Sequence, residues 1–396
     1  MSDNINPEQN DRFDWRIFCL SLVPLSIIVL GEIFKIFFFA EFQKVQNRDH
    51  YIDWWLLLQL VLAPLLGFLS DKFCRKKILL FTLCSLILSA AFLRLSIFFQ
   101  GPSDIPQGLL ELSLILYSIG AVTPIARAAY CDVHITNKKT PNILNTFLVQ
   151  PLPWIFFYKF TFNTVGSIAS LFIFGMITAA LALYYFVDQR DLRHRRLSVR
   201  FKKIREEFGW GLCSRILIAL FISNSAWNLL LFFLEEKESI GIANQYLSLA
   251  LGIAFFGGTI LARLLDIDLK KMIGLSFALI GVFTLIQFIE GTATGNYNTV
   301  LRPIFIAFTF FGGFALPLTY AFFGRSVDLH EQGILYGLLD SFQKLTEWTG
   351  SFTLNHVSTL PDQPFAVAKF IMIIGFIPLL LTISFLRTKW FNREMA

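Results

Sequence analysis

Residues 67–77 read GFLSDKFCRKK, and this polar stretch separates two long apolar runs. The run before it, at about 52–71, and the run after it, at about 77–99, are each long enough to cross a bilayer as a helix. The connection carries one acidic residue, Asp71, together with a group of basic ones. A short basic connection between two apolar runs is typical of a loop on the cytoplasmic face of a membrane protein.

The composition of the whole chain agrees with this interpretation. Of its 396 residues, 55% are hydrophobic and only 16% are charged, and the mean hydropathy is +0.61. Soluble domains carry about 25% charged residues. The composition excludes an ordinary soluble enzyme, a disordered protein and a nucleic-acid binder built on a basic surface.

The apolar runs predict transmembrane helices. Only helices and closed barrels satisfy their own backbone hydrogen bonds in lipid, and these runs are continuous rather than alternating in polarity. The sequence predicts an all-α membrane protein with twelve transmembrane helices. They are expected at about 17–40, 52–71, 77–99, 107–131, 141–160, 164–187, 212–234, 244–264, 272–291, 302–324, 332–354 and 365–387.

One long polar connection, at 188–211, is rich in Arg and Lys and divides the chain almost in half. We expect an N-terminal six-helix half at 1–187, a basic cytoplasmic linker at 188–211 and a C-terminal six-helix half at 212–396. Basic residues concentrate in the connections of one side, which the positive-inside rule assigns to the cytoplasm. We therefore expect a multi-pass protein of the inner (plasma) membrane with both termini in the cytoplasm.

The stretch at 67–77 resembles the loop 2–3 signature of the major facilitator superfamily, Gly-x-Leu-(small)-Asp-(basic)-x-Gly-(basic)-(basic). The matching residues are Gly67, Leu69, Asp71, Lys72, Arg75 and Lys76. Cys74 stands where the family usually has Gly. The resemblance implies two six-helix repeats with a substrate bound between the halves near the midplane.

This stretch also predicts a conformational latch. Asp71 ends one helix and can pair with cationic groups on a neighbouring helix, while Gly67 allows close helix approach. Such a cluster can break when the two halves rock against each other. The alternative is a topogenic basic loop with a capping Asp. The predicted latch residues are Gly67, Asp71, Lys72, Arg75 and Lys76.

Charged residues inside the predicted spans are costly and usually functional. Span 1 carries Glu32 and Lys35 on one helix face, near its outer end, and span 11 carries Asp340, Lys344 and Glu347 on one stripe. Burial favours the protonated form of a carboxylate, and a neighbouring Lys favours the charged form. Glu32, Asp340, Lys344 and Glu347 are therefore candidates for proton coupling. The alternative is that they form fixed ion pairs between helices.

Other polar residues are candidates for substrate binding. Arg127 follows Gly120 and Pro124 in span 4, an arrangement similar to the span 4 pattern of the family. It can bind an anionic substrate group, or pair with Asp132 or Asp71. The uncharged candidates, each of which can instead form an interhelical hydrogen bond, are Asn224, Asn228, Gln343, Tyr320 and Trp348.

Several function classes lack their motifs. There is no phosphate-binding Gly-rich loop with Lys-Ser/Thr, no nucleophile elbow and no HExxH signature. The five histidines show no metal-ligand spacing, and no cysteine lies in an expected outside loop. We expect no enzyme activity, no catalytic residues, no cofactor and no metal.

The expected function is secondary active transport of a small polar or charged metabolite, such as an amino acid or organic ion, by alternating access. Proton-coupled uptake is the favoured mode, because carboxylates lie within the spans and no nucleotide site is present. The alternatives are proton-driven export of a drug-like compound or siderophore, a non-transporting receptor or scaffold, and a lipid-modifying enzyme. The expected partners are a small-molecule substrate, protons and the lipid bilayer, without nucleic acid. We expect a monomer.

Overall fold

The computed structural model shows the apolar runs as helices. It describes residues 15–42, 48–99, 105–136, 143–157, 210–237, 242–264, 279, 282, 289, 297–325, 327 and 331–357. All regular structure within these ranges is helical. The expected spans 164–187 and 365–387, most of 272–291, and residues 188–209 of the expected linker lie outside the described residues. The total of twelve spans therefore stays a prediction.

The first three helices each correspond to one expected span. They are α1 (Trp15–Phe42), α2 (Arg48–Lys72) and α3 (Arg75–Phe98). Only Phe73 and Cys74 separate α2 from α3, so the basic stretch at 67–77 forms a tight helix-to-helix connection. This connection brings the end of α2 and the start of α3 together.

The next two expected spans are each interrupted near a proline. The fourth consists of α4 (Ile105–Ile119) and α5 (Val122–Thr136), and the described part of the fifth contains α6 (Leu144–Val149) and α7 (Leu152–Phe157). A proline has no N–H to donate to the carbonyl four residues earlier. Pro124 and Pro151 therefore weaken the helix at Gly120 and around Gln150, where the two breaks occur.

In the second half the described helices are α9 (Trp210–Lys237), α10 (Ile242–Leu264), α12 (Tyr297–Arg325) and α13 (Gln332–Val357). They correspond to the expected spans 7, 8, 10 and 11. Helices α10 and α12 approach closely, because a Cβ on Gly258 or Gly313 would collide with backbone atoms of the opposite helix. Small residues permit such close helix packing in membranes.

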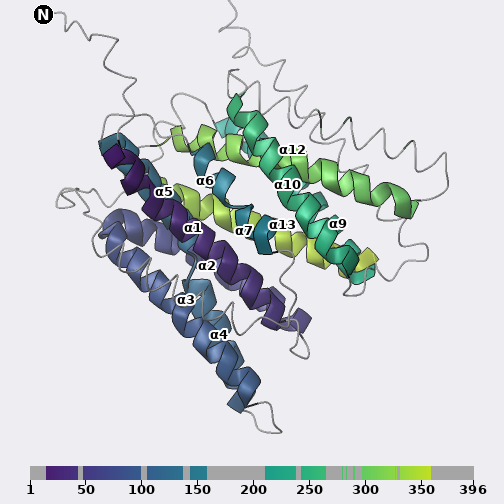
Figure 1. Cartoon of the computed structure of the whole chain (residues 1–396), viewed down its shortest axis with the longest axis horizontal. Coiled ribbons are helices and arrows are strands. Elements are labelled where there is room, and N and C mark those ends of the chain that lie inside the picture. Colours follow the sequence, from purple (N-terminus) through teal and green to yellow (C-terminus); the bar gives the residue numbers. More distant parts are fainter. Residues whose placement is uncertain are drawn as a thin grey trace, which may run out of the picture.

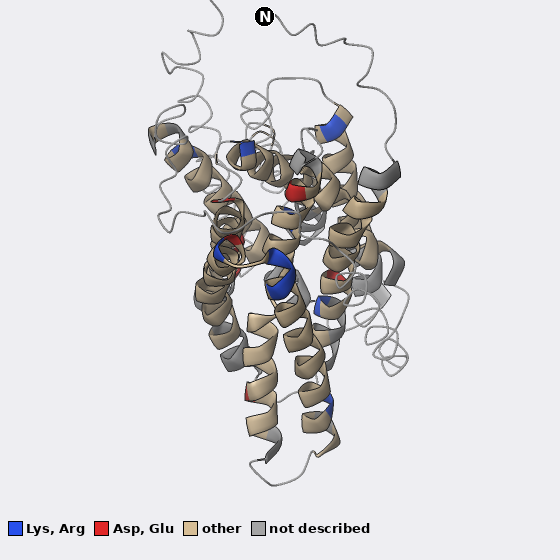
Figure 2. Cartoon of the chain, turned by 90° about the vertical axis from the view of Figure 1, so that its left-hand side faces the viewer, with Lys and Arg blue, Asp and Glu red and all other residues tan. Residues whose placement is uncertain are grey.

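Several helices have the length and polarity of transmembrane segments. In the described part of the chain, four stretches are long and apolar enough to cross a bilayer: Trp54–Lys72, Arg75–Ser96, Gln107–Val133 and Ile306–Arg325. Figure 2 shows that charged residues are sparse along the helices. Large apolar side chains such as Val61 and Phe98 lie on the surface. These features are those of a multi-pass membrane protein.

Helix α13 connects the two halves. In Figure 1 it runs between the group formed by α1 to α4 and the group formed by α9, α10 and α12. It packs most extensively on α2 of the first half and then on α9 of its own half. One apolar core lies within α1 to α5, and a second combines the helices of the second half with residues of α5 and α6. Residues on α13 are thus placed at the interface between the halves.

Candidate functional site

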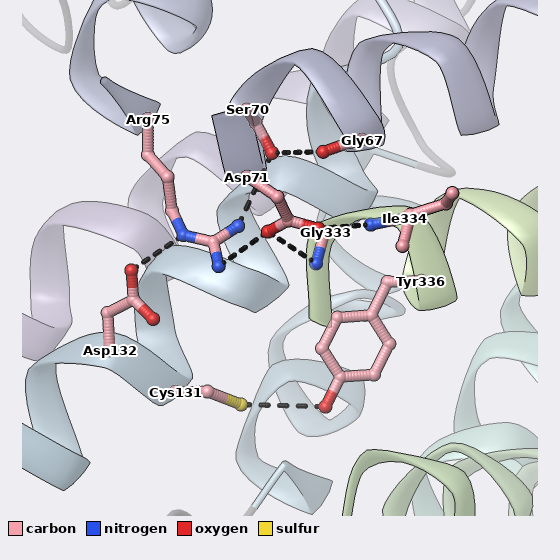
Figure 3. A network of polar contacts seen from close by, with 9 residues as sticks. All are labelled: Gly67, Ser70, Asp71, Arg75, Cys131, Asp132, Gly333, Ile334 and Tyr336. Carbon is pink, nitrogen blue, oxygen red and sulfur yellow. Dashed lines mark hydrogen bonds and ion pairs between the residues drawn. The ribbon is translucent and has the colours of Figure 1, made fainter. Parts of the chain in front are cut away.

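The carboxylate of Asp71, at the end of α2, binds the first turn of α13 (Figure 3). Its Oδ1 accepts a hydrogen bond from the Gly333 backbone N–H at 3.0 Å, and its Oδ2 accepts one from the Ile334 N–H at 2.7 Å. The first N–H groups of a helix have no partner within the helix, and the helix dipole adds partial positive charge there. Asp71 of the first half therefore caps a helix of the second half.

Arg75, the first residue of α3, extends this arrangement to α5. Its Nη2 lies 2.8 Å from Asp71 Oδ1, and its Nε lies 2.6 Å from Asp132 Oδ2. Its Nη1 donates to the Ser70 hydroxyl at 3.3 Å. The guanidinium is buried, so these contacts are little screened by water. We call the group of Ser70, Asp71, Arg75, Asp132, Gly333 and Ile334 the Asp71 network.

Of the five predicted latch residues, Asp71 and Arg75 belong to the Asp71 network. Gly67 lies beside it, because its carbonyl oxygen accepts a hydrogen bond from the Ser70 hydroxyl. Lys72 is exposed, with its ammonium 5.6 Å from the centre of the Phe73 ring, and Lys76 is half-buried. The cation beside Asp71 is Arg75 of the next helix, whereas α13 contributes backbone amides. Sequence reasoning missed those amides. Nearly every residue has a backbone N–H group, so the residue types do not show which of these groups binds Asp71.

Glycines let α2 and α13 approach closely at the Asp71 network. A Cβ on Gly67 would collide with the Gly333 carbonyl oxygen. A Cβ on Gly333 would lie 2.5 Å from Ser70 Oγ and 2.6 Å from Asp71 Oδ1, and one on Gly337 would lie 2.5 Å from the Ala63 carbonyl oxygen. The two backbones are therefore close enough for Asp71 to reach the amides of α13.

A second group of charged side chains lies further inside the bundle. Lys35 on α1 interacts electrostatically with Glu347, Glu32 and Asp340, and Asp340 also interacts with Arg127 and Lys344. Helices α1 and α5 of the first half and α13 of the second half supply these residues. Glu32 and Lys35 thus face the middle of α13. We call this group the interior charged cluster: Glu32, Lys35, Arg127, Asp340, Lys344 and Glu347.

Within this cluster Lys344 pairs with Glu347. The ammonium nitrogen lies 2.9 Å from Glu347 Oε1 and 2.8 Å from Oε2, and it lies 5.0 Å from the centre of the Trp55 ring on α2. Both members of the ion pair belong to α13, one turn apart. The ion pair itself therefore does not tie two helices together. The contacts of its members with the first half are the cation–π contact of Lys344 with Trp55 and the electrostatic interaction of Glu347 with Lys35.

Arg127 lies on α5 among aromatic rings and an amide. Its Nη2 donates to Gln150 Oε1 at 2.8 Å, and Gln150 Nε2 donates in turn to Glu32 Oε1 at 3.0 Å. Its guanidinium carbon lies 4.1 Å from the centre of the Phe147 ring and 4.8 Å from that of Tyr320. Of the two acidic partners considered from the sequence, Asp132 and Asp71 are both bound by Arg75. Gln150, at the break between α6 and α7, is the direct partner of Arg127.

The uncharged candidates of the second half lie on or beside α13. Asn228 Nδ2 donates to the Asn224 carbonyl at 2.9 Å and to Thr346 Oγ1 at 3.3 Å, so it joins α9 to α13. Gln343 is half-buried on α13. Trp348 stacks on Phe352, with ring centres 5.4 Å apart, and packs against the apolar core of the first half. Among the described residues, no group of His, Cys, Asp or Glu is arranged to hold a metal ion.

Comparison with solved structures shows which fold these helices form. The human organic anion transporter MFSD10 (TETRAN) superposes with a TM-score of 0.68 at 12% identity, covering 93% of this chain and 99% of that chain. The chain has the major facilitator superfamily fold. A bacterial homologue of the iron transporter ferroportin, in an outward-facing state, gives a TM-score of 0.66 at 14% identity, with coverages of 95% and 99%.

A third solved structure with the major facilitator fold is FucP in its outward conformation. It superposes with a TM-score of 0.65 at 12% identity, covering 93% of this chain and 99% of that chain. No protein-family model matches the sequence, and no curated protein matches it. The major facilitator fold with its two repeats, expected from residues 67–77, is thus supported by three-dimensional similarity over nearly the whole chain, while six helices in each repeat stay a prediction.

Proposed function

We propose that this protein is a secondary active transporter that moves a small polar or charged metabolite across the inner membrane by alternating access. In the major facilitator fold, two repeats rock about a site near the midplane. The observation that carries the proposal is the interior charged cluster, to which both halves contribute. Charges inside a membrane protein are costly, and they usually mark a pathway for ions or substrates.

The Asp71 network gives this transporter a contact that closes one end. The connection between α2 and α3 is basic, and the positive-inside rule assigns it to the cytoplasm. The residues that join α2, α3 and α5 to α13 therefore form a cytoplasmic latch. With the latch closed, the interior charged cluster is accessible only from the other side of the membrane, and breaking the latch opens the cytoplasmic path.

Protons are the proposed energy source, and uptake is the proposed direction. Glu32, Asp340 and Glu347 are carboxylates inside the bundle, and Lys344 is a cation able to exchange partners between them. A carboxylate that is charged in one conformation and protonated in the other carries a proton across the membrane. The charged interior favours a polar metabolite over a drug-like export substrate. One of the similar structures is an organic anion transporter.

The proton proposal is tested with Asp340→Asn in proteoliposomes loaded with a pH-sensitive dye. Wild-type protein should accumulate radiolabelled amino acids or organic acids when a pH gradient is imposed, and the dye should report accompanying protons. Asp340→Asn should abolish gradient-driven accumulation while keeping exchange of the same solute between the two sides. The matched control is Glu111→Gln, because Glu111 is exposed on α4 and contacts Gln107. Undiminished accumulation by Asp340→Asn would refute coupling at this residue.

A further inference from the structure

Arg127 is a buried cation with unused hydrogen-bonding capacity. Its side chain is 1% exposed, and Nη2 donates a hydrogen bond to the Gln150 amide oxygen. Its Nε and Nη1 have no hydrogen-bond partner in the described structure, and the same holds for the hydroxyl of Tyr320, which is 0% exposed. Arg127 and Tyr320, which lie against each other, thus both present donors. In the described structure Asp340 interacts with Arg127 through its charge without a hydrogen bond to it, and Glu32 reaches it only through Gln150.

Leaving such groups without an acceptor is unfavourable. A buried polar group without a hydrogen bond costs free energy, and a buried unpaired charge costs more. The rings of Phe147 and Tyr320 lie against the guanidinium and restrict its rotation. Further hydrogen bonds from it must therefore go to acceptors in the plane of the guanidinium, at the edges that carry Nε and Nη1.

Gln150 lies between Arg127 and the carboxylate of Glu32. Its amide accepts from Arg127 through Oε1 and donates to Glu32 through Nε2. An amide can serve both partners because it has an acceptor on one side and donors on the other. Arg127 and Glu32 are thereby held apart, and the guanidinium keeps its charge without a direct carboxylate partner in the described structure.

We propose that Arg127 and Tyr320 form the site that recognises the anionic group of the solute, a carboxylate or phosphate on a small organic molecule. Arginine suits these groups because its planar donors match their oxygens, and the neighbouring rings offer apolar contact to the organic part. Tyr320 donates its hydroxyl to the same anion. This inference rests on the proposed transport function, whose substrate class it names.

The test measures thermal stability of the purified full-length protein with matched pairs of compounds. Benzoate, succinate and glycerol 3-phosphate are the anionic probes, and benzamide, succinamide, glycerol and benzylamine are their neutral or cationic counterparts. A ligand that binds only the folded protein raises its Tm. We expect at least one anion to raise the Tm by about 2 °C or more, and its counterpart to leave the Tm unchanged.

Three variants assign the effect to Arg127. Arg127→Gln should weaken anion binding by about 30-fold or more, because a buried charge partner is lost. Arg127→Lys should keep part of the binding, since charge remains without the planar donors. Arg215→Gln on α9 is the control and should respond like the wild type, because Arg215 has no described contact with the cluster. An equal anion response in Arg127→Gln would overturn the proposal, as would a panel in which no anion raises the Tm.

A double variant tests the site without any added ligand. The double variant Glu32→Gln with Gln150→Glu exchanges the amide and the carboxylate between these two positions. It keeps the net charge and places the new carboxylate at position 150, in contact with Arg127. We expect this variant to have a higher Tm than the wild type without ligand and to lose its response to the anion. An unchanged Tm together with an intact response would contradict an open anion site at Arg127.

Transport and recognition are distinguished by a separate assay in proteoliposomes. An anion that stabilises the protein through Arg127 but is never transported would contradict the transport function and leave the binding site standing. Saturable transport of a neutral or cationic solute only, unaffected by Arg127→Gln, would leave the transport function standing and overturn the anion site.

Discussion

The Asp71 network and the interior charged cluster are both buried groups of charges at the interface between the halves, but they differ in how far their charges are satisfied. Asp71 accepts from two backbone amides and faces Arg75, which in turn contacts Asp132. Arg127 in the interior has one acceptor and two nitrogens without any in the described structure.

This difference separates a structural contact from a working site. A paired charge stabilises the one conformation in which its partners meet, so Asp71 and Arg75 hold α13 against α2 and α5. A charge without its partners destabilises the protein until a ligand or proton arrives, and proteins keep such groups mainly where function requires them. Variants in the first group should therefore shift the conformational equilibrium, and variants in the second should change binding or coupling.

The largest effect is expected for Asp71→Asn. The uncharged Asn side chain removes the negative charge that faces Arg75 and the backbone N–H groups of α13. Breaking a buried charge pair costs about 3–5 kcal/mol. The closed latch should lose more than about 100-fold in population, and transport should fall while the protein still inserts. Opening is measured by maleimide labelling of Cys131 in a variant without the other four cysteines. Cys131 is buried, with its Sγ 3.5 Å from the Tyr336 hydroxyl, so it should react only when the latch opens.

The labelling experiment has a control of its own. Lys72→Gln removes an exposed charge of the same stretch that contacts only the Phe73 ring in the described structure, so it should leave Cys131 protected. Unaltered labelling and transport in Asp71→Asn would reject the latch.

A smaller effect is expected for Gly67→Ala. The added methyl group would collide with the Gly333 carbonyl, and overpacking of this kind costs about 1–3 kcal/mol. The helices α2 and α13 must separate slightly, which weakens the Asp71 contacts, so transport should fall about tenfold. The measurement is the transport rate at equal amounts of inserted protein.

The matched variant is Gly312→Ala on α12. A Cβ on Gly312 meets no atom of the described residues within 4 Å, so this substitution should not reduce transport. Equal transport by Gly67→Ala and the wild type would mean that α2 and α13 need not approach this closely during the cycle.

The smallest effect is expected from the ion pair inside α13. Lys344→Met and Glu347→Gln each remove one member of a pair that is partly exposed on the Glu347 side. Each single variant should lower the Tm, and the double variant should lower it by less than the sum, with a coupling of about 1 kcal/mol. Thermal unfolding of all four proteins gives this value. Strict additivity would show that the two side chains act independently.

The sequence predicted many residues of the candidate site, but it did not predict which of them contact each other. The spacing of Asp340, Lys344 and Glu347 places them on one face of any helix, because positions three or four apart lie together. The identity of their neighbours depends on helices far away in the sequence. Gln150 became the partner of Arg127 because proline breaks the fifth span beside it, and a hydropathy pattern does not show where such a break directs a side chain.

The sequence by itself determined that the chain spans a membrane repeatedly, where its basic connections lie and which few charges enter the spans. These properties follow from the cost of exposing polar groups to lipid, which acts on each segment separately. Only the tertiary structure decided that Asp71 accepts hydrogen bonds from backbone amides of α13 and that Arg75 forms an ion pair with Asp132. It also decided that Nε and Nη1 of Arg127 have no acceptors in the described structure. Those outcomes depend on hydrogen bonds of about 3 Å between helices, which exist only after the two halves have packed together.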